Sequence, residues 1–109
     1  MLKFVKKTID MGLFSNLFGG GRNERIQELL NEGAVIIDVR TKGEFQSNHV
    51  QGSKNIPLPE LRGKVKKIKA MNKPVVVCCA SGVRSGQAKL ILEKEGITVE
   101  NGGGWRSLA

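Results

Sequence analysis

A cysteine stands where a run of apolar residues gives way to small and polar ones. Cys79 follows the segment VVVC at residues 75–78 and precedes the segment ASGVRS at residues 80–85. The thiolate is the reactive form of cysteine, and backbone amide dipoles together with a helix N-terminus favour it over the neutral thiol. We therefore expect Cys79 to act as a nucleophile before any base assists it. The alternative is a buried cysteine that only fills space behind a strand.

The residues that follow Cys79 have the types expected of a loop that surrounds a sulfur atom. We predict that this loop consists of Ala80, Ser81, Gly82, Val83, Arg84 and Ser85. The hydroxyls of Ser81 and Ser85 are candidate donors to the sulfur, although Ser85 is equally well explained as a cap for the next helix. Arg84 has two interpretations, because it either holds an anionic donor or pairs with Asp38 or Glu44 and braces the loop.

A strand and a helix must position this loop. The continuous apolar run at residues 75–78 is typical of a strand that is covered on both faces of a parallel sheet. Ala88, Ile91 and Leu92 then recur at helical spacing, and Gly96 is placed to end the helix. The order of strand, loop and helix places Cys79 at the first position of the loop, beside a helix N-terminus.

Strands and helices alternate along the rest of the chain. The expected elements are a helix over 23–33 capped by Asn23, a strand over 34–39, a helical turn over 42–47, a strand over 55–56, a helical stripe over 58–68, a strand over 97–100 and a glycine turn over 102–104. This alternation predicts an α/β fold with an open parallel sheet of about four to five short strands and helices on both faces.

Three sequence blocks, taken in this order, resemble the signatures of the rhodanese family of sulfurtransferases. The loop at residues 79–85 resembles the active-site loop of that family. Upstream, the segments VIIDVR, EF, HVQGS and NIP between residues 35 and 57 are similar to its first signature, and GGGW at 102–105 is similar to its closing turn. The resemblance covers roughly residues 24 to 106 and implies the rhodanese-like fold. We expect the chain to differ from the usual pattern of the family in two places, with no strand before the first helix and no helix after the closing turn.

The resemblance also implies a reaction. The Cys79 thiolate attacks the outer sulfur of a small anionic donor such as thiosulfate, and a persulfide remains in the loop until a thiol or cyanide acceptor removes the sulfur. The donor or acceptor is a small molecule or a partner protein. No cofactor is expected, and no metal, because the chain has one histidine and no cluster at metal-ligand spacing.

The resemblance places the other polar residues in supporting roles. Asp38, Arg40 and Glu44 are expected to be structural charges that tie down the segment after the first strand. His49 has the chemistry of a general base, but a thiolate needs none, and the residue belongs to the structural signature.

Two other classes of function compete with sulfur transfer. Cysteine phosphatases and arsenate reductases have five residues between cysteine and arginine, whereas four separate Cys79 from Arg84. The tighter ring suits one sulfur atom better than a tetrahedral oxyanion. A non-catalytic interaction module of the same fold is the second alternative, and the presence of the nucleophile argues against it.

The charge and the cysteine content of the chain indicate which partners and which cellular compartment to expect. The formal net charge of +8 favours an anionic substrate, and the lysines opposite the 58–68 stripe indicate a solvated helix face, so no nucleic acid is expected. The two neighbouring cysteines indicate a reducing compartment, and we expect a cytoplasmic protein without a secretory signal. We divide the chain into an amphipathic segment with a glycine joint at 1–21 and a domain at 22–109. Membrane contact by residues 1–18 is an open alternative.

Overall fold

A computed structural model of the chain describes residues 21–109. The expected amphipathic segment at 1–18 and the first two glycines of the expected joint lie outside the described residues. Gly21, the third glycine of that joint, is the first residue of a helix.

Four parallel strands form one sheet in the order β2-β1-β3-β4, which confirms the expected α/β architecture. The strands are β1 (Val35–Asp38), β2 (Lys54–Asn55), β3 (Val75–Cys79) and β4 (Val99–Gly104). All three strand pairs are parallel, and the register shifts between Val77 and Cys79 where β3 meets β4. Because the strands run in one direction, the carboxyl ends of β1 and β3 lie at the same edge of the sheet.

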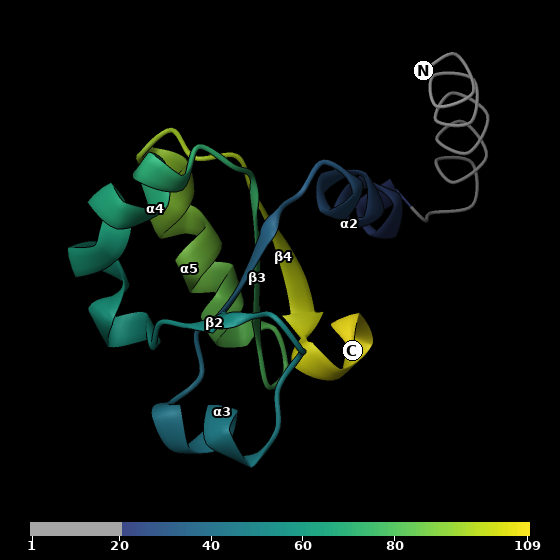
Figure 1. Ribbon diagram of the computed structural model, residues 1–109, viewed down its shortest axis with the longest axis vertical. Coiled ribbons are helices and arrows are strands. Elements are labelled where there is room, and N and C mark those ends of the chain that lie inside the picture. The colour runs from purple at the N-terminus through teal and green to yellow at the C-terminus, as the bar shows by residue number, and fades with distance from the viewer. Residues whose placement is uncertain (1–20) are drawn as a thin grey trace.

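Helices cover both faces of the sheet (Figure 1). They are α2 (Gly21–Asn31), α3 (Lys42–Ser47), η1 (Leu58–Lys64), α4 (Val65–Met71), α5 (Val83–Lys94) and η2 (Trp105–Leu108), the two η elements being 3-10 helices. On one face, Val76 packs with apolar residues of α2. On the other, Val75 and Val77 pack with residues of η1, α4 and α5. The alternation of side chains along β3 thus separates two layers of core.

Three expected element boundaries were wrong. Helix α2 includes Asn23, which therefore does not cap it, because the packing of Ile26 and Leu29 fixes a helix that begins a turn earlier than the local signal suggests. The 58–68 stripe is divided into η1 and α4 near Gly63, a residue that weakens the interior of an α-helix. Strand β3 extends one residue further than expected and ends at Cys79 itself.

The glycines at 102–104 form the end of β4 rather than the expected turn. A Cβ atom on Gly102 would lie 2.9 Å from side-chain atoms of Val76 and Leu108, and one on Gly104 would lie 2.8 Å from the Ala80 carbonyl oxygen. Glycine in a strand often marks such a close approach of neighbouring atoms. Gly102 therefore allows β4 to pack tightly against β3 and η2, and Gly104 allows it to approach the loop that follows Cys79.

Candidate active site

Cys79 is the last residue of β3, and its sulfur lies against the start of α5. The sulfur accepts a hydrogen bond from the Gly82 amide at 3.0 Å and from the Ser85 amide at 3.4 Å. The first amides of a helix have no partner within it, and a side chain of the N-cap residue usually satisfies them. Here the N-cap is Gly82, which has no side chain, and the cysteine sulfur takes that role.

Gly82 gives the loop its tight curvature. Its φ of +103° lies in the left-handed region, and a Cβ atom there would approach Gly103 Cα to 3.3 Å. Glycine is the residue that adopts this conformation without strain. The position therefore turns the 80–82 segment back over the sulfur, and the approach of Gly103 from β4 leaves no room for a larger residue.

The electrostatics of the loop favour the Cys79 thiolate. Burial is the largest single influence and raises the pKa of Cys79, but hydrogen bonds from the Ser85 hydroxyl and from the amides of Ser85, Gly82 and Ser81 outweigh it. The pKa of Cys79 consequently lies below its ordinary value. Each of these bonds is stronger to a charged sulfur than to a neutral one. The residue is only 1% exposed, so the loop and the surrounding core cover it almost completely.

Cys78 differs from its neighbour in every respect that matters for reactivity. Its side chain points to the other face of the sheet, where it packs with Val50 and Trp105. Burial, assisted by the charge of Asp38, raises the pKa of Cys78 to about 12. Cys78 is therefore a neutral core residue at physiological pH, whereas the donors around Cys79 favour the charged form of its thiol.

Ser85 and Asn101 connect the sulfur to β4. The Ser85 hydroxyl lies 3.3 Å from the Cys79 sulfur and 2.7 Å from Asn101 Oδ1. Asn101 Oδ1 also accepts from the Gly103 amide at 2.8 Å, and Asn101 Nδ2 donates to the Gly82 carbonyl at 3.0 Å. These two backbone partners fix the orientation of the amide group. Asn101 was not predicted, because the local sequence contains no sign of a contact between β4 and a loop about 20 residues earlier.

Arg84 braces the loop in this structure. Its guanidinium donates two hydrogen bonds to Glu44, at 2.8 Å to Oε1 and 3.1 Å to Oε2. Thr41 and Glu44 form a capping box at the start of α3. The bond from Arg84, followed by the one from the Thr41 amide, lowers the pKa of Glu44 to about 2. Of the two expected partners, Arg84 pairs with Glu44 and not with Asp38.

The remaining predicted residues occupy supporting or peripheral places. Asp38 and Arg40 form a buried pair at 2.8 Å on the same side of the sheet as Cys78, with the Arg40 guanidinium 4.8 Å from the centre of the Trp105 ring. His49 stacks on Phe45 and bonds to its carbonyl oxygen at 2.7 Å, as expected of a structural residue.

Three loop residues lie at the surface. Val83 is 70% exposed at the start of α5, and both Ala80 and Ser81 are exposed. The backbone amide of Ser81, rather than its hydroxyl, contributes to the sulfur site. The loop side chain in contact with the sulfur is therefore that of the buried Ser85.

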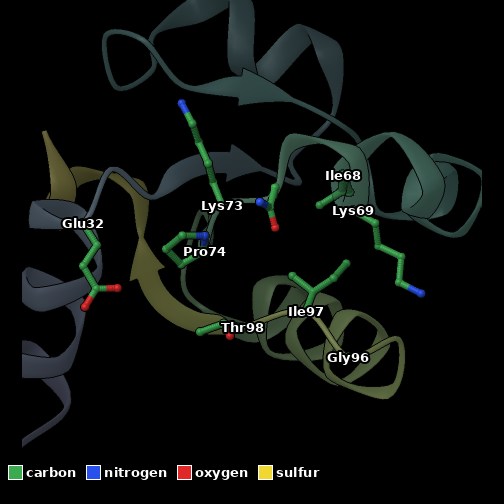
Figure 2. Close-up of a pocket in the computed structure, with 9 residues that line it drawn as sticks. Glu32, Ile68, Lys69, Lys73, Pro74, Gly96, Ile97 and Thr98 are labelled. Atoms are coloured by element: carbon green, nitrogen blue, oxygen red, sulfur yellow. The ribbon is translucent and has the colours of Figure 1, made fainter.

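A separate cleft of about 300 Å³ lies at the opposite edge of the sheet (Figure 2). It is lined by Ile68, Pro74 and Ile97 with Lys69 and Lys73 beside them, and neither cysteine is among its lining residues. Among residues 21–109, no group of three or more His, Cys, Asp or Glu residues is arranged to hold a metal ion. Nor does any helix in that range have the length and apolar character to cross a membrane.

Comparisons with known proteins agree with this arrangement. The family profile described as Rhodanese-like domain matches residues 23–107. Thiosulfate sulfurtransferase PspE of Escherichia coli is 45% identical over 75 residues, which cover 67% of this chain and 72% of the relative. Thiosulfate sulfurtransferase GlpE of Pseudomonas savastanoi is 35% identical, covering 69% of this chain and 70% of the relative. A solved structure described as a rhodanese with anions from E. coli is 42% identical, with a TM-score of 0.63 over 70% of this chain and 92% of that one. This chain, with its cysteine loop between a parallel strand and a helix, belongs to the rhodanese-like domain family.

Proposed function

We propose that the protein transfers a sulfane sulfur from thiosulfate or a related anionic donor to a thiol or cyanide acceptor, through a persulfide on Cys79. The observation that carries the proposal is the set of amide and hydroxyl donors around the Cys79 sulfur. These donors stabilise negative charge on sulfur, which is the property that both a nucleophilic thiolate and a persulfide anion require. The names of the related thiosulfate sulfurtransferases support the same reaction.

The first half-reaction loads the cysteine. The Cys79 thiolate attacks the outer sulfur of thiosulfate, a new S–S bond forms to that sulfur, and the S–S bond of the donor breaks. Sulfite leaves with the electron pair of the broken bond. The outer sulfur of the persulfide then carries the negative charge within reach of the loop amides.

The second half-reaction restores the enzyme. An acceptor thiolate or cyanide attacks the outer sulfur, and the Cys79 sulfur leaves as a thiolate. The acceptor becomes a persulfide or thiocyanate. Sulfur passes from one nucleophile to another with no external oxidant, so the residues of the loop suffice for the exchange.

The charge of the protein favours an anionic donor. The chain has a formal net charge of +8, and the helix N-terminus of α5 is directed at the sulfur. Arg84 is engaged by Glu44, so the amides of the loop, rather than a free guanidinium, provide the main attraction at the sulfur itself. We also infer a reducing compartment such as the cytoplasm, because the reaction needs Cys79 as a free thiol.

A steady-state assay of thiocyanate formation from thiosulfate and cyanide tests the proposal. Cys79→Ser should abolish thiocyanate formation, whereas Cys78→Ala should retain it, because only Cys79 faces the loop donors. Wild-type protein that forms neither thiocyanate with cyanide nor a persulfide with a small thiol would contradict the proposed reaction. Hydrolysis of an aryl phosphate at a comparable rate would instead support a cysteine phosphatase, a result we do not expect from the short spacing between Cys79 and Arg84.

A further inference from the structure

Helix α5 exposes two large apolar side chains on one face. Val83 is 70% exposed and Leu90 is 60% exposed, and they are the exposed large hydrophobic residues within 21–109. Val83 and Leu90 are seven residues apart and therefore lie on the same side of the α-helix. Gln87 and Lys94, each four residues after one of them, lie on that side too. This face begins at the end of the Cys79 loop, because Val83 is the first residue of α5.

A groove between α5 and η1 continues this apolar face. Two adjoining hollows of about 440 and 540 Å³ share Arg62, Ile91 and Lys94 as lining residues. Leu58 and Pro59 of η1 line the first hollow opposite Leu90. We refer to the surface formed by Val83, Gln87, Leu90, Lys94, Leu58 and Arg62 as the α5 docking face.

The charges around this surface have one predominant sign. Arg62, Lys66 and Lys94 line the hollows, and none of the three forms an ion pair with another residue in the described part of the chain. Glu95 is the acidic residue of the lining, and Lys69 pairs with it at 3.9 Å. A surface with an apolar centre and unpaired cations is complementary to an acidic partner that contributes apolar side chains.

We propose that the α5 docking face binds an acidic protein that delivers sulfur to Cys79 or receives it. The inference rests on the proposed function and specifies the kind of protein that exchanges sulfur. A persulfide extends the reactive atom outward by one S–S bond of about 2 Å, so a thiol brought to the Val83 end of α5 approaches the loop that holds it. A small, charge-assisted surface gives fast and short-lived association, which suits an exchange in which partners must depart.

A binding experiment tests the surface without using sulfur chemistry. The probes are two fluorescein-labelled synthetic peptides of equal length that contain leucine and serine, one with glutamates and the other with lysines at the same positions. We expect the protein to bind the acidic peptide at least about tenfold more tightly by fluorescence anisotropy, with affinity that falls as salt is added. Leu90→Ser and Arg62→Glu should each remove most of this preference.

Lys73→Glu is the matched control. It makes the same change of charge at an exposed residue that lines the separate cleft and neither docking hollow, so it should change the affinity less than Arg62→Glu does. Equal affinity for the two peptides, or equal losses from Arg62→Glu and Lys73→Glu, would contradict the proposal. Concentration-dependent self-association, or binding to anionic phospholipid vesicles, that is lost in Leu90→Ser would assign the face to a second copy or a membrane and would also overturn it.

A kinetic measurement separates this inference from the proposed function. Persulfide-loaded protein is mixed with cyanide, or with the acidic peptide carrying cysteine in place of one serine. Arg62→Glu should slow discharge to the peptide about tenfold and leave discharge to cyanide unchanged. Equal slowing with both acceptors would mean that the substitution damages the site, and it would contradict a docking role. Failure of wild-type discharge to cyanide would instead count against the proposed function, while the anisotropy result still decides the docking face.

Discussion

Removing the Ser85 hydroxyl should raise the pKa of Cys79, because the thiolate loses one of its hydrogen-bond donors. Ser85→Ala deletes the side-chain donor that lies 3.3 Å from the sulfur, and it leaves the Ser85 and Gly82 amides in place. A hydrogen bond to a charged group contributes about 1.5–3 kcal/mol, and one between neutral groups about 0.5–1.5 kcal/mol. The hydroxyl has a single proton and also contacts Asn101 Oδ1 at 2.7 Å, so donating to the thiolate means giving up that neutral bond. The midpoints of the two ranges differ by about 1.3 kcal/mol, which is the net stabilisation of the thiolate that Ser85→Ala should remove.

Ultraviolet absorbance of the thiolate during a pH titration measures this shift. The chain contains no tyrosine, whose ionisation would otherwise obscure the signal. Burial raises the pKa of Cys78 to about 12, so Cys79 titrates well before its neighbour. Because the folded pKa of Cys79 is lowered, reactivity is present above that pKa and is lost as the pH falls through it. Ser85→Ala should move this loss to higher pH.

Ser81→Ala is the control for the Ser85 titration. Ser81 is exposed and contributes to the sulfur site through its backbone amide, which the substitution retains. We therefore expect the pKa of Cys79 in Ser81→Ala to match that of the wild type. An unchanged or lower pKa in Ser85→Ala, with the protein still folded, would refute the role assigned to the hydroxyl.

Three further substitutions probe the support of the loop. Gly82→Ala should destabilise the protein by about 1–3 kcal/mol in urea titrations and slow sulfur transfer, since the residue has a φ of +103° and Gly103 leaves little room for a Cβ atom. Asn101→Ala should cost about 2 kcal/mol by the same measurement, because the Gly82 carbonyl and the Gly103 amide lose their partner; an unchanged urea midpoint would contradict this. Glu44→Gln should cost less than about 1 kcal/mol at pH 7, as the pair with Arg84 is about one-third exposed. The folded pKa of Glu44 is lowered to about 2, so its contribution is present above the unfolded pKa near 4.5 and should disappear as the pH falls toward 2.

The sequence predicts those parts of the site that depend on neighbouring residues. The apolar run of β3, the helical spacing of α5 and the small residues between them are local patterns, and together they place Cys79 at a helix N-terminus. The short helix α3 also has the predicted bounds, because its capping box is a local signal. The general architecture follows from the alternation of such segments.

The features of the site that the sequence does not predict depend on contacts between segments that are distant along the chain. Asn101 of β4 contacts the loop through Ser85 and Gly82, and no periodicity in its own strand indicates these two partners. The partner of Arg84 was left open between Asp38 and Glu44, since the choice depends on where α3 lies relative to the loop. The glycines at 102–104 were assigned to a turn because glycine is common in turns, whereas here they accommodate close packing.

Intact-protein mass spectrometry before and after exposure to thiosulfate tests the central claim most directly. The persulfide mechanism predicts that the wild type gains the mass of one sulfur atom, that Cys78→Ala gains it too, and that Cys79→Ser gains nothing while remaining folded. Peptide mapping under non-reducing conditions should place the added sulfur on Cys79, whose sulfur is surrounded by the loop donors. Added sulfur on Cys78, or a Cys79→Ser variant that still gains sulfur, would contradict the mechanism.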